Sequence, residues 1–173
     1  VVDIELPPIV RFERQGGGKE AIERAAKLLS EAKFPVILSG AGVVIGDAIE
    51  DCKKVAEKLG APVATSRSGI GSLPTSHPQS VGMLGFYGTE TARESISEAD
   101  LILVLGCALG EQTTFGWRSE IFEKDALILQ VDVDASQLNR VYKLDQGIAF
   151  DVGAVLNKLS ANIEKRNSWF HRR

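Results

Sequence analysis

The sequence predicts an α/β fold, an open six-stranded parallel sheet with helices on both faces. Short apolar runs typical of buried strands alternate five or six times with segments of helical periodicity. The strongest run, Leu101–Leu105, is apolar at every position, as in a strand that a parallel sheet buries on both faces. Parallel neighbours then require right-handed crossovers through helices.

Length and charge limit the classes of function. With 173 residues, the chain fits one domain at 16–162 between an N-terminal arm or linker at 1–15 and a C-terminal linker tail at 163–173. Twenty Lys and Arg against 23 Asp and Glu give a net charge of −3, which excludes a broadly basic nucleic-acid module. Two Cys and two His exclude a disulfide scaffold and leave little for a metal cluster.

We expect no membrane segment and a cytoplasmic location. The apolar stretches at 35–46 and 101–110 are shorter than the ~20 residues that a bilayer requires, and glycines interrupt them. The first eight residues lack the basic start and long apolar run of a signal peptide. A first residue of Val rather than Met suggests a piece of a longer chain.

The first part of the chain alternates between helix and strand. After three glycines at 16–18, apolar spacing predicts a helix over about 21–29. Pro35–Leu38 is predicted as a buried strand, Asp47–Leu59 as a second helix that Gly60 ends, and Pro62–Thr65 as a second strand.

The middle of the chain contains two long loops. The first, 66–88, includes a short predicted strand at Val81–Met83. Thr89 is expected to cap a helix that runs to Glu98, and the strand Leu101–Leu105 leads into the second loop, 106–117.

The last part continues the alternation. We expect one helical turn at Ser119–Phe122 and a strand at Leu127–Val131. Asp134–Gln137 matches a capping box and so predicts the start of a helix. Ile148–Phe150 is predicted as the last strand, and Asp151 as the cap of a final helix.

In an open parallel sheet, ligands bind beyond the carboxyl ends of the strands. The residues found there are mostly small, glycine or acidic, and small residues allow a phosphate to approach backbone amides. These segments are Ser39–Gly42, Thr65–Ser68, Gly106–Ala108, Asp132–Asp134 and Asp151.

The first of these segments departs from the dinucleotide fingerprint. Residues 40–46 have the spacing G-x-G-x-x-x-G, one residue too long, and Thr65 and Ser66 occupy the place of the expected ribose-binding acid. No Walker motif occurs. Gly40 and Gly42 are therefore equally well explained by a tight strand-to-helix turn.

Individual side chains allow more than one interpretation. Asp132 ends a strand, where a carboxylate accepts hydrogen bonds from ribose hydroxyls, whereas Asp134 and Asp151 fit helix caps. Arg67 is a candidate partner for a pyrophosphate, and Cys107 fits a buried structural thiol better than a nucleophile. The loop aromatics either stack on a ring or pack between domains; they are Phe86, Tyr87, Phe115 and Trp117.

The sequence offers no catalytic constellation and indicates a nucleotide-binding type of domain without its own active site. The motifs also occur in a familiar order: Pro35–Val43, Gly60–Ser66, Gly69–Pro74, Ala99–Gly106 and Gln130–Asp134. Together, over about residues 20–160, they resemble the central domain of thiamine-diphosphate-dependent enzymes. Examples are acetolactate synthase, oxalyl-CoA decarboxylase, sulfoacetaldehyde acetyltransferase and benzoylformate decarboxylase.

This resemblance implies a divergent Rossmann fold, the NAD/FAD-binding type related to deoxyhypusine synthase. It also implies flanking pyrimidine- and diphosphate-binding domains that hold thiamine diphosphate and Mg²⁺, a homo-oligomeric parent enzyme, and a central domain that is catalytically silent alone. The parent would be a 2-keto acid decarboxylase or carboligase, or an acyltransferase.

In acetolactate synthase this domain binds FAD, and in oxalyl-CoA decarboxylase it binds ADP. The resemblance places Asp132 and Val133 near the ribose and Phe150 and Asp151 near the adenine. The other implied binding residues are Ser39, Gly40, Ala41, Gly42, Thr65, Ser66, Arg67 and Gly106.

One departure concerns the central strand. Many flavin-binding members have Gly-Ala-Arg after it, and this chain has Gly106-Cys107-Ala108. A lost charge-assisted contact costs about 1.5–3 kcal/mol, so a structural spacer is an alternative to a nucleotide site. A free-standing NAD- or flavin-dependent protein of the same fold and an assembly module are further alternatives.

Overall fold

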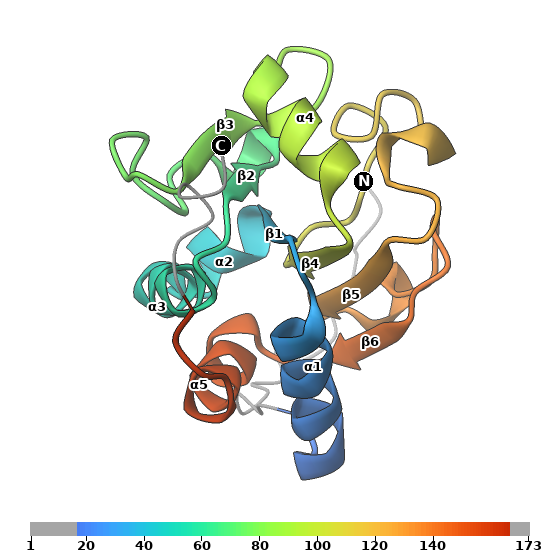
Figure 1. Ribbon diagram of the computed structural model, residues 1–173. Helices are drawn as coiled ribbons and strands as arrows, with labels where there is room; N and C mark the ends of the chain where they lie inside the picture. The colour runs from blue at the N-terminus through green and yellow to red at the C-terminus, as the bar shows by residue number, and fades with distance from the viewer. Residues whose placement is uncertain (1–16, 167–173) are drawn as a thin grey trace, which may run out of the picture.

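Six parallel strands form the centre of the molecule in the order β3-β2-β1-β4-β5-β6, in a computed structural model that describes residues 17–166 (Figure 1). This confirms the predicted fold class. The strands are β1 Pro35–Ser39, β2 Val63–Thr65, β3 Ser80–Met83, β4 Leu101–Leu105, β5 Leu127–Asp132 and β6 Gln146–Ala149. The order reverses between β1 and β4, and such a switch point is where open α/β sheets bind ligands.

Helices cover both faces of the sheet. Helices α1 (Lys19–Glu31), α3 (Ile49–Leu59) and α5 (Val152–Asn162) lie on one face, and α4 (Glu90–Glu98) lies on the other (Figure 1). Every residue of β1 and β4 is buried, as expected for central strands enclosed on both sides. Two apolar cores result, one on each face.

The predicted helix caps are confirmed. The Thr89 hydroxyl accepts a hydrogen bond from the Ala92 N–H at 3.2 Å, and Asp151 Oδ1 accepts one from the Ala154 N–H at 2.9 Å. Gly60 ends α3 in the left-handed conformation, with φ +61°. A side-chain cap at a helix N-terminus typically contributes ~1 kcal/mol.

Three elements differ from the sequence prediction. A short helix, α2 (Ala41–Ile45), follows β1 directly where a loop was expected. The capping box at Asp134 begins only a three-residue 3₁₀ turn, η3 (Ala135–Gln137), because Leu138 is already extended. Strand β6 starts two residues before the prediction, where the Gln146 side chain is anchored on the Ala21 carbonyl in α1.

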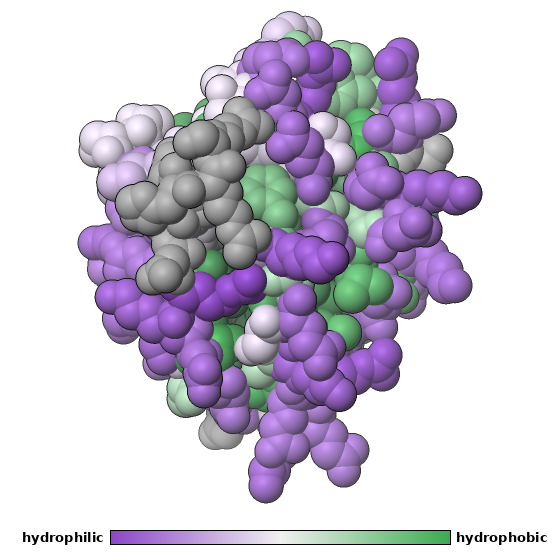
Figure 2. All heavy atoms as spheres, in the orientation of Figure 1, coloured by the Kyte–Doolittle hydropathy of each residue, from purple (hydrophilic) through white to green (hydrophobic). Residues whose placement is uncertain are grey.

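Charged and polar side chains cover most of the face that Figure 2 shows. Between residues 17 and 166, no helix is both long and apolar enough to cross a membrane. The predicted arm at 1–15 and the end of the predicted tail lie outside the described residues.

Candidate functional site

The strand ends singled out from the sequence meet around one pocket. It has a volume of about 1020 Å³ and lies beyond the carboxyl ends of β1, β2, β4 and β5. Ligand pockets commonly measure about 300–1,000 Å³, so this one has room for a nucleotide. The predicted site residues that line it are Ala41, Gly42, Ser66, Arg67, Gly106, Asp132, Val133 and Asp151.

Close backbone packing between glycines joins the strand ends beneath the pocket, and two of these glycines, Gly42 and Gly106, line it. A Cβ atom on Gly40 would lie 2.6 Å from the Cys107 Cα, and one on Gly42 would lie 2.7 Å from the Gly106 Cα. A Cβ atom on Gly69 would lie 2.9 Å from the Gly40 Cα. We call Gly40, Gly42, Gly69 and Gly106 the glycine contact. It requires glycine because any side chain would collide with neighbouring backbone.

The amides of the glycine contact are already used. The Gly40 N–H donates to the Leu105 carbonyl at 2.8 Å, and the Gly42 N–H donates to the Gly106 carbonyl at 3.0 Å. These hydrogen bonds join the loop after β1 to the loop after β4. The packing interpretation of Gly40 and Gly42 therefore explains both residues without a bound phosphate.

Four of the expected binding residues do not line the pocket. Ser39 and Thr65 are the last residues of β1 and β2 and are buried. Ser39 lies next to Cys52, and burial raises the pKa of the Cys52 thiol to about 12. Gly40 contributes only to the packing described above, and Phe150 packs against the core of the α1, α3 and α5 face.

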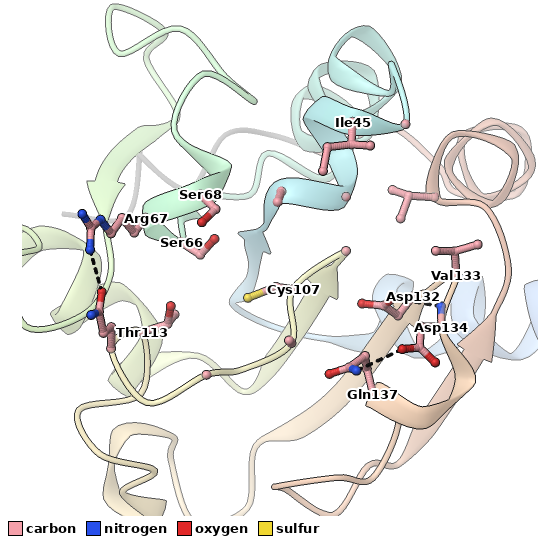
Figure 3. A pocket seen from close by; sticks show the side chains of 18 of the residues that line it. Ile45, Ser66, Arg67, Ser68, Cys107, Thr113, Asp132, Val133, Asp134 and Gln137 are labelled. Carbon is pink, nitrogen blue, oxygen red and sulfur yellow. Dashed lines mark hydrogen bonds between the residues drawn. The ribbon is translucent and has the colours of Figure 1, made fainter. Parts of the chain in front are cut away.

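Hydroxyls and a guanidinium form one side of the pocket. Ser66, Ser68 and Arg67 lie together there, around the 3₁₀ turn η1 (Arg67–Gly69) (Figure 3). Arg67 Nη1 donates to Gln112 Oε1 at 3.1 Å, and this bond connects η1 to the loop after β4. This side offers hydrogen-bond donors and one positive charge.

Carboxylates form the opposite side. Asp132, at the end of β5, is 8% exposed, and its side chain points into the pocket (Figure 3). Its Oδ1 accepts a hydrogen bond from the Asp134 N–H at 3.0 Å. Burial raises the pKa of Asp132, while the backbone N–H groups of Asp134 and Val133 act in the opposite direction. Within the described part of the chain, no side chain donates a hydrogen bond to this carboxylate.

Asp134 differs from Asp132 because its carboxylate is already paired. Oδ1 accepts from the Ser136 N–H at 2.9 Å, and Oδ2 accepts from the Gln137 side-chain amide at 3.1 Å. Hydrogen bonds from Ser136 and Gln137 lower the pKa of Asp134. Asp134 therefore stays charged next to Asp132 and adds to the negative potential of this side.

Cys107 lies at the bottom of the pocket and is 4% exposed. Burial raises the pKa of its thiol, so little thiolate is present near neutral pH. The Ser66 side chain forms a hydrogen bond with it. These features fit the predicted structural thiol and not a nucleophile.

Several lining residues were not proposed from the sequence. Ile45 on α2 is one of them and is 82% exposed. Together with Val133, which the sequence analysis proposed and which is 75% exposed, it forms an apolar rim at the mouth (Figure 3). The sequence gives no signal for the exposure of Ile45, because residues 41–45 contain no polar side chain. The loop after β4 supplies four more lining residues at 110–113, directly after Leu109, whose φ is +50°. The remaining additions are Gly46, Gln137 and Val152. The pocket is also lined by Ser68, Cys107, Ala108 and Asp134, which belong to the strand-end segments singled out from the sequence.

The fold and the pocket together define a Rossmann-like α/β domain whose pocket lies at the switch point of the sheet. Across residues 17–166, no group of three or more His, Cys, Asp or Glu side chains is placed to hold a metal ion. Residues 22–159 match the family model described as thiamine pyrophosphate enzyme, central domain. The chain belongs to this family, which confirms the resemblance found in the sequence.

Curated relatives agree with the family assignment. The chain is 48% identical over 160 residues to a probable sulfoacetaldehyde acetyltransferase of Rhizobium meliloti (strain 1021), covering 92% of this chain and 27% of that protein. It is 34% identical, over an alignment of 183 residues, to a probable acetolactate synthase large subunit of Methanocaldococcus jannaschii. This alignment covers 99% of this chain and 31% of that protein. The chain therefore spans less than a third of the length of these relatives.

A solved structure shares the fold. The crystal structure of benzoylformate decarboxylase from Polynucleobacter necessarius superposes with a TM-score of 0.77 at 21% identity. The match covers 96% of this chain and 31% of that one.

Proposed function

We propose that this chain is the central domain of a thiamine-diphosphate-dependent acetyltransferase that acts on sulfoacetaldehyde. The support is 48% identity, over 92% of the chain, to a probable enzyme of that name. Thiamine diphosphate and Mg²⁺ would be held by flanking pyrimidine- and diphosphate-binding domains, and the central domain alone would be inactive. A carboligase of the acetolactate synthase type is the second candidate, supported by 34% identity over 99% of the chain.

Within the chain, we propose that the pocket binds ADP or the ADP part of FAD. The observation that carries this proposal is Asp132, a buried carboxylate that points into the pocket with no side-chain donor of its own among the described residues. Ribose hydroxyls would donate to Asp132, while Arg67 and Ser68 on the opposite side would contact the diphosphate. The apolar rim of Ile45 and Val133 would contact the base.

Calorimetric titration of the 173-residue chain with ADP and with FAD tests the nucleotide site. We expect one binding site per chain, and at least tenfold weaker binding for Asp132→Ala because the ribose hydroxyls lose their acceptor. Asp125→Ala is the matched control, since Asp125 is exposed just before the opposite end of β5. Absence of binding by both ligands would show that the domain is a structural spacer.

We also propose that 1–15 and 163–173 are linkers and that the parent enzyme is a homo-oligomer. At the described part of the second segment, Ile163 packs into the core and the Arg166 N–H donates to the Lys58 carbonyl at 2.7 Å. Three aromatic side chains on nearby loops are more than half exposed and would be covered by the flanking domains: Phe86, Tyr87 and Trp117.

Tryptophan quenching tests this coverage. With Trp169 replaced by Phe, fluorescence reports on Trp117 in the 173-residue chain. We expect acrylamide to quench Trp117 readily in this chain and several times less when the same chain is part of the complete enzyme, once other tryptophans there are replaced. Equal quenching in both forms would contradict an interdomain position for Trp117.

A further inference from the structure

The charges that line the pocket are unevenly distributed. Glu111, Asp132, Asp134 and Asp151 are acidic, and Arg67 is basic. Arg67 lies on the opposite side of the pocket from Asp132 and Asp134 (Figure 3). A ligand that reaches from Arg67 to Asp132 therefore meets a cation at one end and the two carboxylates of Asp132 and Asp134 at the other.

Asp132 determines which groups the acidic end can accept. When it is ionised, its carboxylate has no proton to donate and can only accept hydrogen bonds. The residue is nine-tenths buried, and the backbone N–H of Asp134 is one of its hydrogen-bond partners. A ligand group that donates hydrogen bonds, such as a ribose diol, satisfies this carboxylate. A phosphate group brings only acceptors and about −1.5 to −2 charge, so it leaves the carboxylate unsatisfied and adds repulsion.

Arg140 and Arg67 offset this repulsion only in part. The positive charge of Arg140 helps to lower the pKa of Asp134. However, Arg140 is exposed and does not line the pocket, and its guanidinium donates to the Ala108 carbonyl at 3.3 Å. Arg67 is held by Gln112 on the far side.

We propose that Asp132, reinforced by Asp134, restricts the pocket to adenine nucleotides with a free ribose diol and excludes those that carry a 2′- or 3′-phosphate. ADP-like and FAD-like ligands would enter, whereas the nucleotide portions of NADP-type and coenzyme-A-type molecules would not. This inference rests on the nucleotide site proposed above and specifies its substrate class.

Three isomers test the proposal: ADP, adenosine 2′,5′-bisphosphate and adenosine 3′,5′-bisphosphate. They have the same composition and differ in where the second phosphate is attached. For the 173-residue chain we expect ADP to bind at least thirtyfold more tightly than either bisphosphate in calorimetric titration. Raising the salt concentration from 0.05 to 0.5 M should reduce this difference in affinity, because salt screens the repulsion between the added phosphate and the carboxylates.

Two variants separate charge from shape. Asp132→Asn removes the charge and keeps an acceptor, so we expect weaker ADP binding and a several-fold smaller preference for ADP over the bisphosphates. Asp125→Asn should leave this preference unchanged. If Asp132→Asn does not unfold cooperatively, and so is not properly folded, Asp134→Asn provides the same comparison. We expect it to reduce the preference for ADP over the bisphosphates by a smaller factor. ADP binding with bisphosphates of equal affinity would overturn this inference and leave the nucleotide site intact. Failure of all three isomers to bind would overturn both.

Discussion

The glycine contact and the acidic side of the pocket are built by different means. The glycine contact brings the loops after β1 and β4 together through backbone atoms, and its amides at Gly40 and Gly42 are bonded internally. The acidic side consists of side chains, and Asp132 retains capacity to accept hydrogen bonds. A glycine-rich strand end thus indicates close packing, while the charged strand end carries the chemistry that a ligand would detect.

The largest expected effect comes from breaking the glycine contact. Gly40→Ala places a methyl group against the Gly106 carbonyl and 2.6 Å from the Cys107 Cα, both backbone atoms that cannot rotate away. We expect a loss of about 3 kcal/mol or more in the free energy of unfolding, measured by urea denaturation. Gly110→Ala is the control in the same pocket, since nothing lies within 4 Å of its Cβ position. A Gly40 variant as stable as this control would contradict the packing role.

A medium effect on stability is expected when the acidic residues that cap helices and turns are replaced. Asp151→Ala removes the cap of α5, an eleven-residue helix, and should cost about 1 kcal/mol in urea denaturation. Asp134→Ala removes the cap of a three-residue turn and should cost less than about 0.5 kcal/mol. The reverse order would show that η3 matters more to the fold than its length indicates.

A smaller effect, of opposite sign, is expected for Asp132→Asn. Burial raises the pKa of Asp132 in the folded state, so its ionisation destabilises the fold as pH rises from the unfolded-state pKa, about 3.9, through the folded-state value. At pH 7 the variant should be more stable than the wild type by less than about 1 kcal/mol, and the difference should vanish below pH 3.9. Thermal melts between pH 3 and 8 measure it. If the variant's extra stability over the wild type grew towards acid pH, the raised pKa of Asp132 would be contradicted.

The smallest effect concerns the thiols below the pocket. Cys52 and Cys107 are both buried, and burial raises the pKa of each. We expect no measurable alkylation by iodoacetamide in the folded chain at pH 8 over an hour, and two labels per chain in urea, counted by mass spectrometry. Labelling of Cys107 at the rate of a free thiol would show that the glycine contact opens.

The sequence predicted the strands and caps because their signals are local. Continuous apolar runs and single cap residues such as Thr89 and Asp151 do not depend on distant contacts. The site was located in part, because carboxyl ends of parallel strands necessarily share one edge. Helix α2 was missed since five residues give too little periodicity. Phe150 was expected near the adenine only from the family resemblance, and it packs against the same core as Ile148, just beyond the end of β6.

Loop paths were beyond sequence reasoning for a physical reason. The loop after β4 is held by contacts far along the chain, such as the Phe86 N–H that donates to the Gln112 carbonyl at 3.1 Å. The Arg67–Gln112 bond is another contact of this kind. Neither leaves a trace in local residue patterns, so Gln112 and Thr113 could be placed only from coordinates.

The pairing of β1 with β4 also joins the N-terminal three strands to the C-terminal three. Arg67 belongs to the first group and Asp132 to the second, so a molecule reaching from one to the other would bridge segments that are distant in the chain. Binding there would slow amide hydrogen exchange in both halves at once, and the seam between them would become the most protected part of the sheet.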